Sequence, residues 1–222
     1  MSKLTKLQNL AQNKMARLNS AGEWLPPLFL RLILFWEFFE AGLEKFNGEN
    51  WFSHIQDNFP FPFNHIDTDI SWFMATWGEM VFAVLLLIGL GTRFAAFSLI
   101  VITSVATAAV HWPADYGSLA ELWQGYAISN DGFGNFKLPL LFIIMLMPLL
   151  FSGGGKFSLD YLAAKLMHTD EFGRTQSDFI SKGLALAVMG VTLYFVMPSL
   201  GIALLIAGLI LTILDKFITP TG

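Results

Sequence analysis

The sequence contains no cysteine among its 222 residues. The chain therefore has no disulfide bond, no thiolate nucleophile, no cysteine-bound metal or iron–sulfur cluster and no covalently attached c-type haem. Charge is also scarce: charged residues make up 14% of the sequence, against about 25% in an ordinary soluble domain. The net charge of −4 argues against general binding of polyanions, so we expect no nucleic-acid partner.

Long apolar runs dominate the chain, since 55% of its residues are apolar. Six runs come close to the length of about 20 residues that crosses a bilayer. They cover residues 25–46, 72–90, 94–112, 138–151, 183–197 and 200–214. The last two are parted only by Pro198 and Ser199. The sequence thus predicts an all-α membrane protein, with a four-helix transmembrane bundle and a C-terminal two-helix transmembrane hairpin in the lipid bilayer.

Lysine and arginine are absent from the two long connections, residues 47–71 and 113–136. They gather instead in residues 1–24 and in the connections at the opposite ends of the runs. Because basic loops stay on the cytoplasmic side, this asymmetry predicts six spans with both termini in the cytoplasm.

The same pattern divides the chain into four segments. Residues 1–24 lack the apolar run and cleavage site of a signal peptide, and they form either an amphipathic helix on the membrane surface or a disordered tail. Residues 25–152 form the bundle and residues 183–222 the hairpin. Residues 153–182 form a cytoplasmic interfacial connection, in which Ser158 is placed to cap a short helix.

Ionisable residues lie inside the first two runs. Glu37, Glu40 and Glu44 are spaced i, i+3 and i+7, which places them on one helix face, and Glu79 lies at a similar depth in the second run. Each charge costs roughly 2.5–3.5 kcal/mol at the bilayer centre, so we expect these acids to face the bundle interior. Arg31 lies nearer the cytoplasmic end.

A polar stripe continues the predicted site, because Thr103, Thr107 and His111 are spaced i, i+4 and i+8. The candidate catalytic residues are Glu37, Glu40, Glu79 and His111. The candidate cofactor-binding residues are Arg31, Trp77, Thr103, Thr107 and Lys137. A structural alternative stays open, in which buried ion pairs only fix the helix register and His111 is an ordinary interfacial histidine.

Metal and haem sites are not predicted. His54, His65 and His111 fall on the outer side of the predicted topology, where a histidine–carboxylate site is a minor alternative. No two histidines lie at matching depth on two of the predicted helices, so we expect no haem held by a pair of axial histidines.

Four stretches together resemble the DoxX family of small bacterial and archaeal membrane proteins. They are LRLILFWEFFEAGLEKF from residue 30, WGEMVFAVLLLIGLGTRFAA from residue 77, TSVATAAVHWP from residue 103, and KLPLLFIIMLMPLLFSGGGKFSLD from residue 137. The resemblance covers about residues 25–165 and implies a four-helix bundle in the bacterial inner membrane, associated with redox metabolism. The arginine and the acid of the family pattern correspond to Arg31 and Glu79, whereas Glu37 and Glu40 have no counterpart in that pattern.

Three functions follow as hypotheses. The first is a quinone-interacting redox subunit, in which the carboxyls and His111 relay protons, Trp77 helps to line a ring site, and a partner supplies the electrons. The second is a membrane scaffold or maturation partner for redox or copper-handling proteins, and the third is a small proton-coupled transporter. Protein partners or a homo-oligomer are expected in each case, and the sequence leaves open whether the chain is an enzyme.

Overall fold

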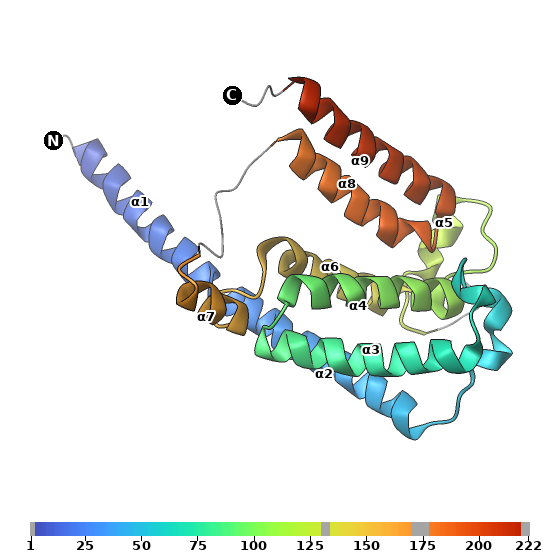
Figure 1. The fold of residues 1–222 in the computed structure, drawn as a ribbon. Coiled ribbons are helices and arrows are strands. Elements are labelled where there is room, and N and C mark those ends of the chain that lie inside the picture. Colours follow the sequence, from blue (N-terminus) through green and yellow to red (C-terminus); the bar gives the residue numbers. More distant parts are fainter. Residues whose placement is uncertain (1–2, 130–133, 170–177, 219–222) are drawn as a thin grey trace.

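We describe a computed structural model, which covers residues 3–129, 134–169 and 178–218 (Figure 1). Within those ranges every regular element is helical, which confirms the predicted all-α class. The long helices are α1 (Lys3–Gly22), α2 (Leu25–Asn47), α3 (Thr68–Ile88), α4 (Thr92–Ala106), α6 (Lys137–Ser152), α8 (Phe179–Tyr194) and α9 (Pro198–Ile218). The short elements are η1 (Phe52–His54), η2 (Gln56–Asn58), η3 (Phe63–His65), the π-helical turn η4 (Thr107–His111), α5 (Leu119–Leu122), η5 (Trp123–Gly125) and α7 (Leu159–Leu166).

Helices α2, α3, α4 and α6 form a four-helix bundle. Its centre is filled by fully buried apolar side chains from all four helices: Leu34, Leu86, Leu99, Ile100, Leu146 and Leu149. Three helical segments are long and apolar enough to cross a membrane by length and composition, namely Thr68–Ile88, Thr92–His111 and Pro198–Asp215. Helices α6 and α8 are apolar but shorter, and α2 has 23 residues with several charges.

The α8–α9 hairpin forms a separate pair beside the bundle. The two helices pack backbone against backbone, since a Cβ added at Gly201 would lie 2.4 Å from the Cα of Tyr194. The hairpin contacts the bundle through α4, and its turn lies at the end that carries α5 (Figure 1). We call this end the α5 end and the opposite one the α7 end.

Arg31 joins three parts of the chain at the α7 end. Its side chain is 1% exposed, and Nη1 donates to the carbonyls of Leu86 (3.3 Å) and Leu87 (3.2 Å) in the last turn of α3. Its Nη2 donates to the carbonyl of Phe157, just before α7. Because the last carbonyls of a helix have no intrahelical donor, a buried cation here satisfies them and complements the helix dipole.

Gly89 makes this close approach of Arg31 feasible. It ends α3 with a φ of +68°, in the left-handed region, and a Cβ there would lie 2.4 Å from Nη1 of Arg31. Only glycine combines that backbone conformation with the missing side chain.

Two more charged residues complete helix ends at the same level. Asp160 of α7 accepts hydrogen bonds from the amides of Gly91 (2.7 Å) and Thr92 (2.8 Å) at the start of α4. Arg93 donates to the carbonyls of the last turn of α6, at 2.9 and 2.5 Å. Arg31, Asp160 and Arg93, which we call the helix-end network, thus place opposite charges on the ends of three neighbouring helices.

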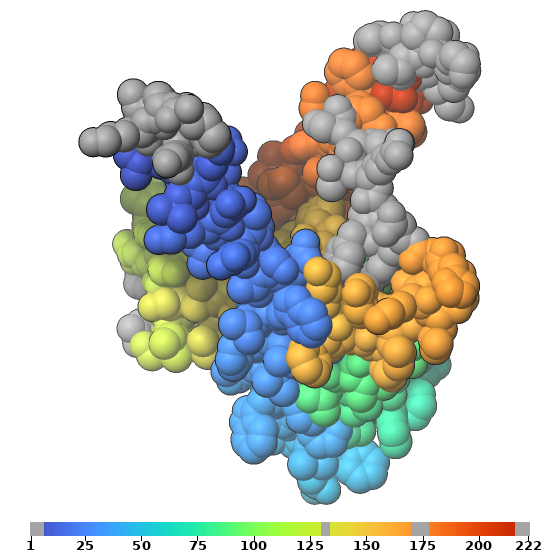
Figure 2. Space-filling view, turned by 90° about the vertical axis from the view of Figure 1, so that its left-hand side faces the viewer, coloured from blue at the N-terminus to red at the C-terminus, as the bar shows by residue number. Residues whose placement is uncertain are grey.

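Most of the N-terminal segment forms helix α1. It extends away from the bundle at the α7 end (Figure 1), the end that faces the viewer in Figure 2, and its side chains from Leu7 onward are exposed. Lys156 forms an ion pair with Glu23 at its base, and this hydrogen bond raises the pKa of Lys156 above its ordinary value. Ser158 caps α7 by accepting from the amide of Tyr161 (3.1 Å), as the sequence predicts.

Replacing Asp160 with alanine tests the helix-end network. The change leaves the first two amides of α4 without their acceptor, and loss of such a cap costs about 1–2 kcal/mol. We expect Asp160→Ala to unfold at a lower temperature than the wild type in detergent. Asp115→Ala, at an exposed residue outside the network, is the control, and equal midpoints for both variants would contradict the assignment.

Candidate functional site

A buried ion pair links α2 and α3 in the half of the bundle nearer the α5 end. Nζ of Lys45 lies 2.8 Å from Oε2 of Glu79, whose residue is only 6% exposed. The helices are in close contact beside this pair. A Cβ atom added at Gly42 would lie only 2.6 Å from Cγ of Met80. This contact lets the lysine side chain reach across to the carboxylate. The structure therefore gives Glu79 a cationic partner.

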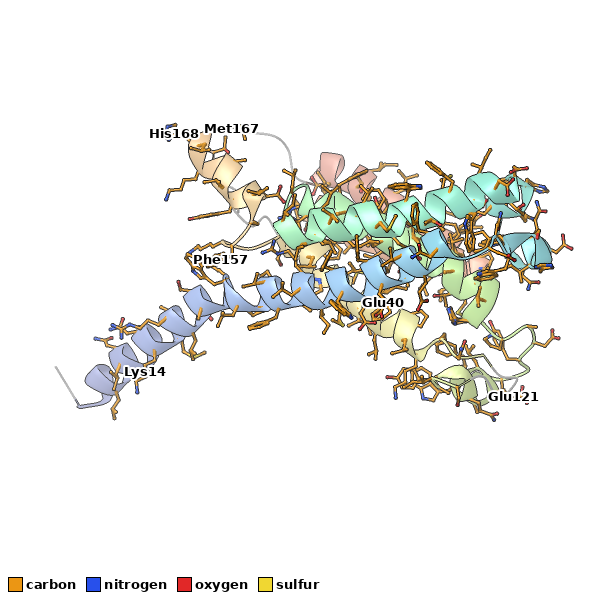
Figure 3. All side chains as sticks on the ribbon, turned by 90° about the horizontal axis from the view of Figure 1, so that it is seen from below. Lys14, Glu40, Glu121, Phe157, Met167 and His168 are labelled. Carbon is orange, nitrogen blue, oxygen red and sulfur yellow. The ribbon has the colours of Figure 1, made fainter. Side chains whose placement is uncertain are left out.

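The other three acids of the predicted cluster lie elsewhere. Glu37, Glu40 and Glu44 are exposed on α2, so the expectation that they face the bundle interior is wrong. Figure 3 shows the Glu40 side chain on the side of α2 that is turned away from α3. The physical reason is the helix geometry: the face that packs on the bundle carries Arg31, Leu34, Phe38 and Gly42, roughly opposite the acids.

Arg31 is distant from Glu79 as well. It precedes Lys45 by fourteen residues, or ~21 Å along the helix at 1.5 Å per residue. Both of its terminal nitrogens donate to backbone carbonyls, so the structure places Arg31 in the helix-end network.

The polar stripe of α4 divides between two surroundings. The Thr103 hydroxyl is buried and has no hydrogen-bond partner among the described residues. Thr107 donates to the carbonyl of Thr103 at 2.6 Å. His111 is half-buried at the end of the π-helical turn, and its Nδ1 lies 2.8 Å from Oδ1 of Asn135.

Trp77 and Lys137 lie apart from this stripe. Trp77 is 43% exposed on the outside of α3, with its ring centroid 5.8 Å from that of Phe46. Lys137 is the first residue of α6, and its Nζ lies 5.3 Å from the ring centroid of Tyr126. The predicted residues thus do not converge on one centre.

A cavity of about 170 Å³ lies where the hairpin meets the bundle at the α5 end. Its walls come from α4, α6, the 112–136 connection and the end of α8. Three hydroxyl residues and two tryptophans lie among apolar side chains: Ser104, Thr107, Thr192, Trp112, Trp123, Leu122, Phe136, Leu140, Ile143, Leu193 and Val196.

The three hydroxyls of this cavity use their protons within their own helices. Each donates its proton to the carbonyl four residues earlier in its own helix, at 2.8 Å for Ser104, 2.6 Å for Thr107 and 2.9 Å for Thr192. A hydroxyl has one proton and two lone pairs, so only lone pairs remain for a ligand. The cavity surface is almost entirely apolar, so it suits an apolar ring, and its lining hydroxyls retain only acceptor capacity.

Sequence analysis identified Thr107 and missed the other polar residues of the cavity. Ser104 precedes Thr107 by three residues and shares its helix face, which was an available signal. Thr192, Trp112 and Trp123 had no such signal, because they meet only where the hairpin packs on α4.

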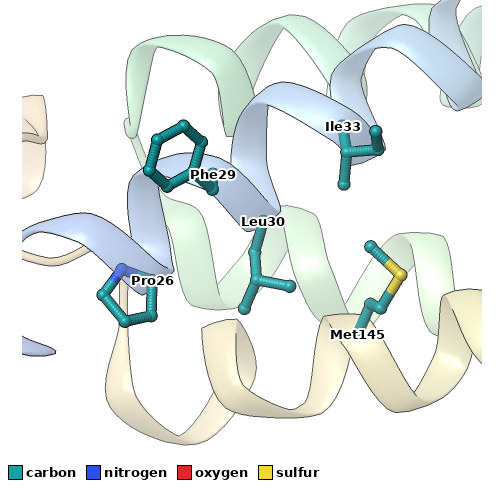
Figure 4. Close-up of a pocket in the computed structure, with 5 residues that line it drawn as sticks. All are labelled: Pro26, Phe29, Leu30, Ile33 and Met145. Atoms are coloured by element: carbon teal, nitrogen blue, oxygen red, sulfur yellow. The ribbon is translucent and has the colours of Figure 1, made fainter.

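A second hollow is an open groove on the outside of the bundle between α2 and α6. It has a volume of about 540 Å³ and is lined by apolar side chains (Figure 4): Pro26, Phe29, Leu30, Ile33 and Met145. It offers a contact surface and no reacting group. Among the residues that the structure describes, no three His, Asp or Glu side chains are grouped to hold a metal ion.

Comparison with known proteins gives a family match that covers helices α2, α3 and α4. The DoxX family model matches residues 27–112, from the first turn of α2 to the residue after the π-helical turn. An uncharacterized protein of Haemophilus influenzae is 44% identical over 156 residues, which cover 70% of this chain and 95% of that protein. No solved structure matches the chain. The family match includes both partners of the Lys45–Glu79 pair.

Breaking that pair from one side tests whether it stabilises the bundle. Lys45→Met leaves Glu79 buried without its cation, and such a loss costs about 3–5 kcal/mol. We expect Lys45→Met to lower the free energy of unfolding in mixed micelles by this amount. The double variant Lys45→Met/Glu79→Gln recovers most of the loss, because it removes the isolated charge.

Lys165→Met, at an exposed lysine of α7, is the control for that series. A double variant as unstable as the single one would show that packing around Lys45, and not charge pairing, carries the effect.

Proposed function

The chain belongs to the DoxX family of membrane proteins, and from this premise we propose that it is a quinone-interacting redox subunit that binds a quinol between the bundle and the hairpin. The observation that carries the proposal is the cavity with acceptor-only hydroxyls. At about 170 Å³ it is smaller than the roughly 300–1,000 Å³ of drug-sized pockets, and it suits a single ring.

The proposal includes six spans in the bacterial inner membrane, with both termini cytoplasmic. The connections without lysine or arginine lie at the α5 end, and the helix-end network with its two arginines lies at the α7 end. The positive-inside rule then places the cavity in the outer half of the bilayer.

The lining residues fit the reduced form of the ring. A quinol carries two hydroxyl donors, and on oxidation it supplies two electrons and two protons. The lone pairs of Ser104, Thr107 and Thr192 accept from such donors. The indoles of Trp112 and Trp123 contribute flat apolar walls, on which a ring packs favourably.

In this proposal His111 accepts the two protons of the quinol one after the other and passes each to the outer side before it takes the next. It ends the π-helical turn that begins at the lining residue Thr107, and it directly precedes the lining residue Trp112. Its Nδ1 is held by Asn135, which fixes the ring orientation, and its partial exposure gives a proton a route to the outer side. The sequence has no recognisable electron carrier, so the electrons pass to a partner protein.

The second candidate is a membrane scaffold, and a different observation favours it. Glu37, Glu40 and Glu44 are exposed on a helix of the transmembrane bundle, which is an unfavourable place for charge unless another protein covers them.

Binding of a short-chain quinol tests the leading proposal. The protein is reconstituted in liposomes, and its affinities for a quinol analogue and for the oxidised form are measured. We expect tighter binding of the quinol, and a loss of about fivefold in Thr107→Val, since one hydrogen bond is worth about 1 kcal/mol.

Thr212→Val is the matched control, because that threonine makes the same i−4 bond on α9 outside the cavity. Equal affinity for the two redox forms, or an unchanged affinity in Thr107→Val, would overturn the assignment of the cavity.

A further inference from the structure

The outward side of α2 carries a regular row of residues, which we call the α2 seam. Its members are Pro26, Leu30, Ile33, Glu37, Glu40 and Glu44. Leu30 is half-buried and the others are exposed. Successive members are alternately four and three residues apart, which is the a/d spacing by which one helix packs along another.

The acidic half of the α2 seam is costly in lipid. Glu37 precedes the end of α2 at Asn47 by ten residues, or about 15 Å. A charge at such depth costs roughly 2.5–3.5 kcal/mol on insertion scales. In the described part of the chain, neither this carboxylate nor those of Glu40 and Glu44 has a hydrogen bond or ion pair. The seam therefore needs a cation at this level.

This chain does not supply that cation from its described residues. Lys45 pairs with Glu79, and Arg31 is engaged at the α7 end. Helix α9 has no lysine or arginine from Pro198 to Asp215. A second copy facing the seam symmetrically would oppose carboxylates with carboxylates, which is repulsive.

We propose that the α2 seam receives a transmembrane helix of a second protein that carries lysine or arginine opposite Glu37, Glu40 and Glu44. The apolar groove of about 540 Å³ continues the seam toward the α7 end and takes the apolar half of that helix. The alternating spacing favours a crossing angle near +20°, the usual left-handed geometry of membrane helices. The inference rests on the proposed membrane span of α2 and is independent of the quinol cavity.

Synthetic transmembrane peptides test the α2 seam on the full-length protein in phosphatidylcholine liposomes. One leucine–alanine peptide carries a single lysine at the depth of Glu40, and its match carries leucine there. Energy transfer between labelled peptide and labelled protein measures the affinity. We expect at least tenfold tighter binding of the lysine peptide, and loss of this difference in Glu37→Gln/Glu40→Gln/Glu44→Gln.

Two controls separate the seam from general effects. Glu49→Gln changes an exposed acid beyond α2 and leaves the difference intact. Ile33→Trp fills the apolar groove and weakens binding of both peptides without touching a charge.

Equal affinity for the two peptides in the wild type would overturn the proposal. So would self-association of the protein that disappears in the triple variant, because it would assign the seam to a second copy.

Discussion

The completion of helix ends is the constraint on which this structure depends. Each helix leaves four amides and four carbonyls without intrahelical partners, and those that packing buries must find partners within the protein. At the α7 end the chain meets this requirement with side chains: Arg31 serves the end of α3, Arg93 the end of α6 and Asp160 the start of α4. Since each residue comes from an element other than the one it completes, the same bonds that satisfy the backbone also fix which helices are neighbours.

Helix α2 separates two kinds of charge by its faces. Lys45 points toward α3, where close contact at Gly42 brings it to Glu79, and the ion pair lies inside the protein. The acids of the α2 seam point the other way and have no such partner among the described residues. Helix α2 thus carries Lys45, whose charge pairs within the bundle, and on its other side the seam acids, which we propose bind a helix of a second protein. The cavity contains a third set of polar atoms. Its three lining hydroxyls donate their protons to carbonyls of their own helices, so only their lone pairs are left for further hydrogen bonds.

The sequence predicted the helices well because apolar runs and capping residues act locally. The run over 25–46 became α2, and Ser158 caps α7 as expected. The site was harder to predict, since spacing tells which residues share a face but not which neighbour that face meets. Glu37 was assigned to the interior on energetic grounds that consider one chain alone. Thr192 was missed because its role arises only when the hairpin packs on α4.

The position of Arg31 in the chain has a consequence for how the protein is made. All three of its acceptors lie later in the sequence, at Leu86, Leu87 and Phe157. During synthesis α2 is therefore complete before any acceptor of its guanidinium exists, and the charge acquires its partners first from α3 and then from the segment before α7. The full set of acceptors of Arg31 exists only after residue 157 has been synthesised. The α8–α9 hairpin comes later still in the chain, so the cavity, which Thr192 helps to line, can form only after the partners of Arg31 exist.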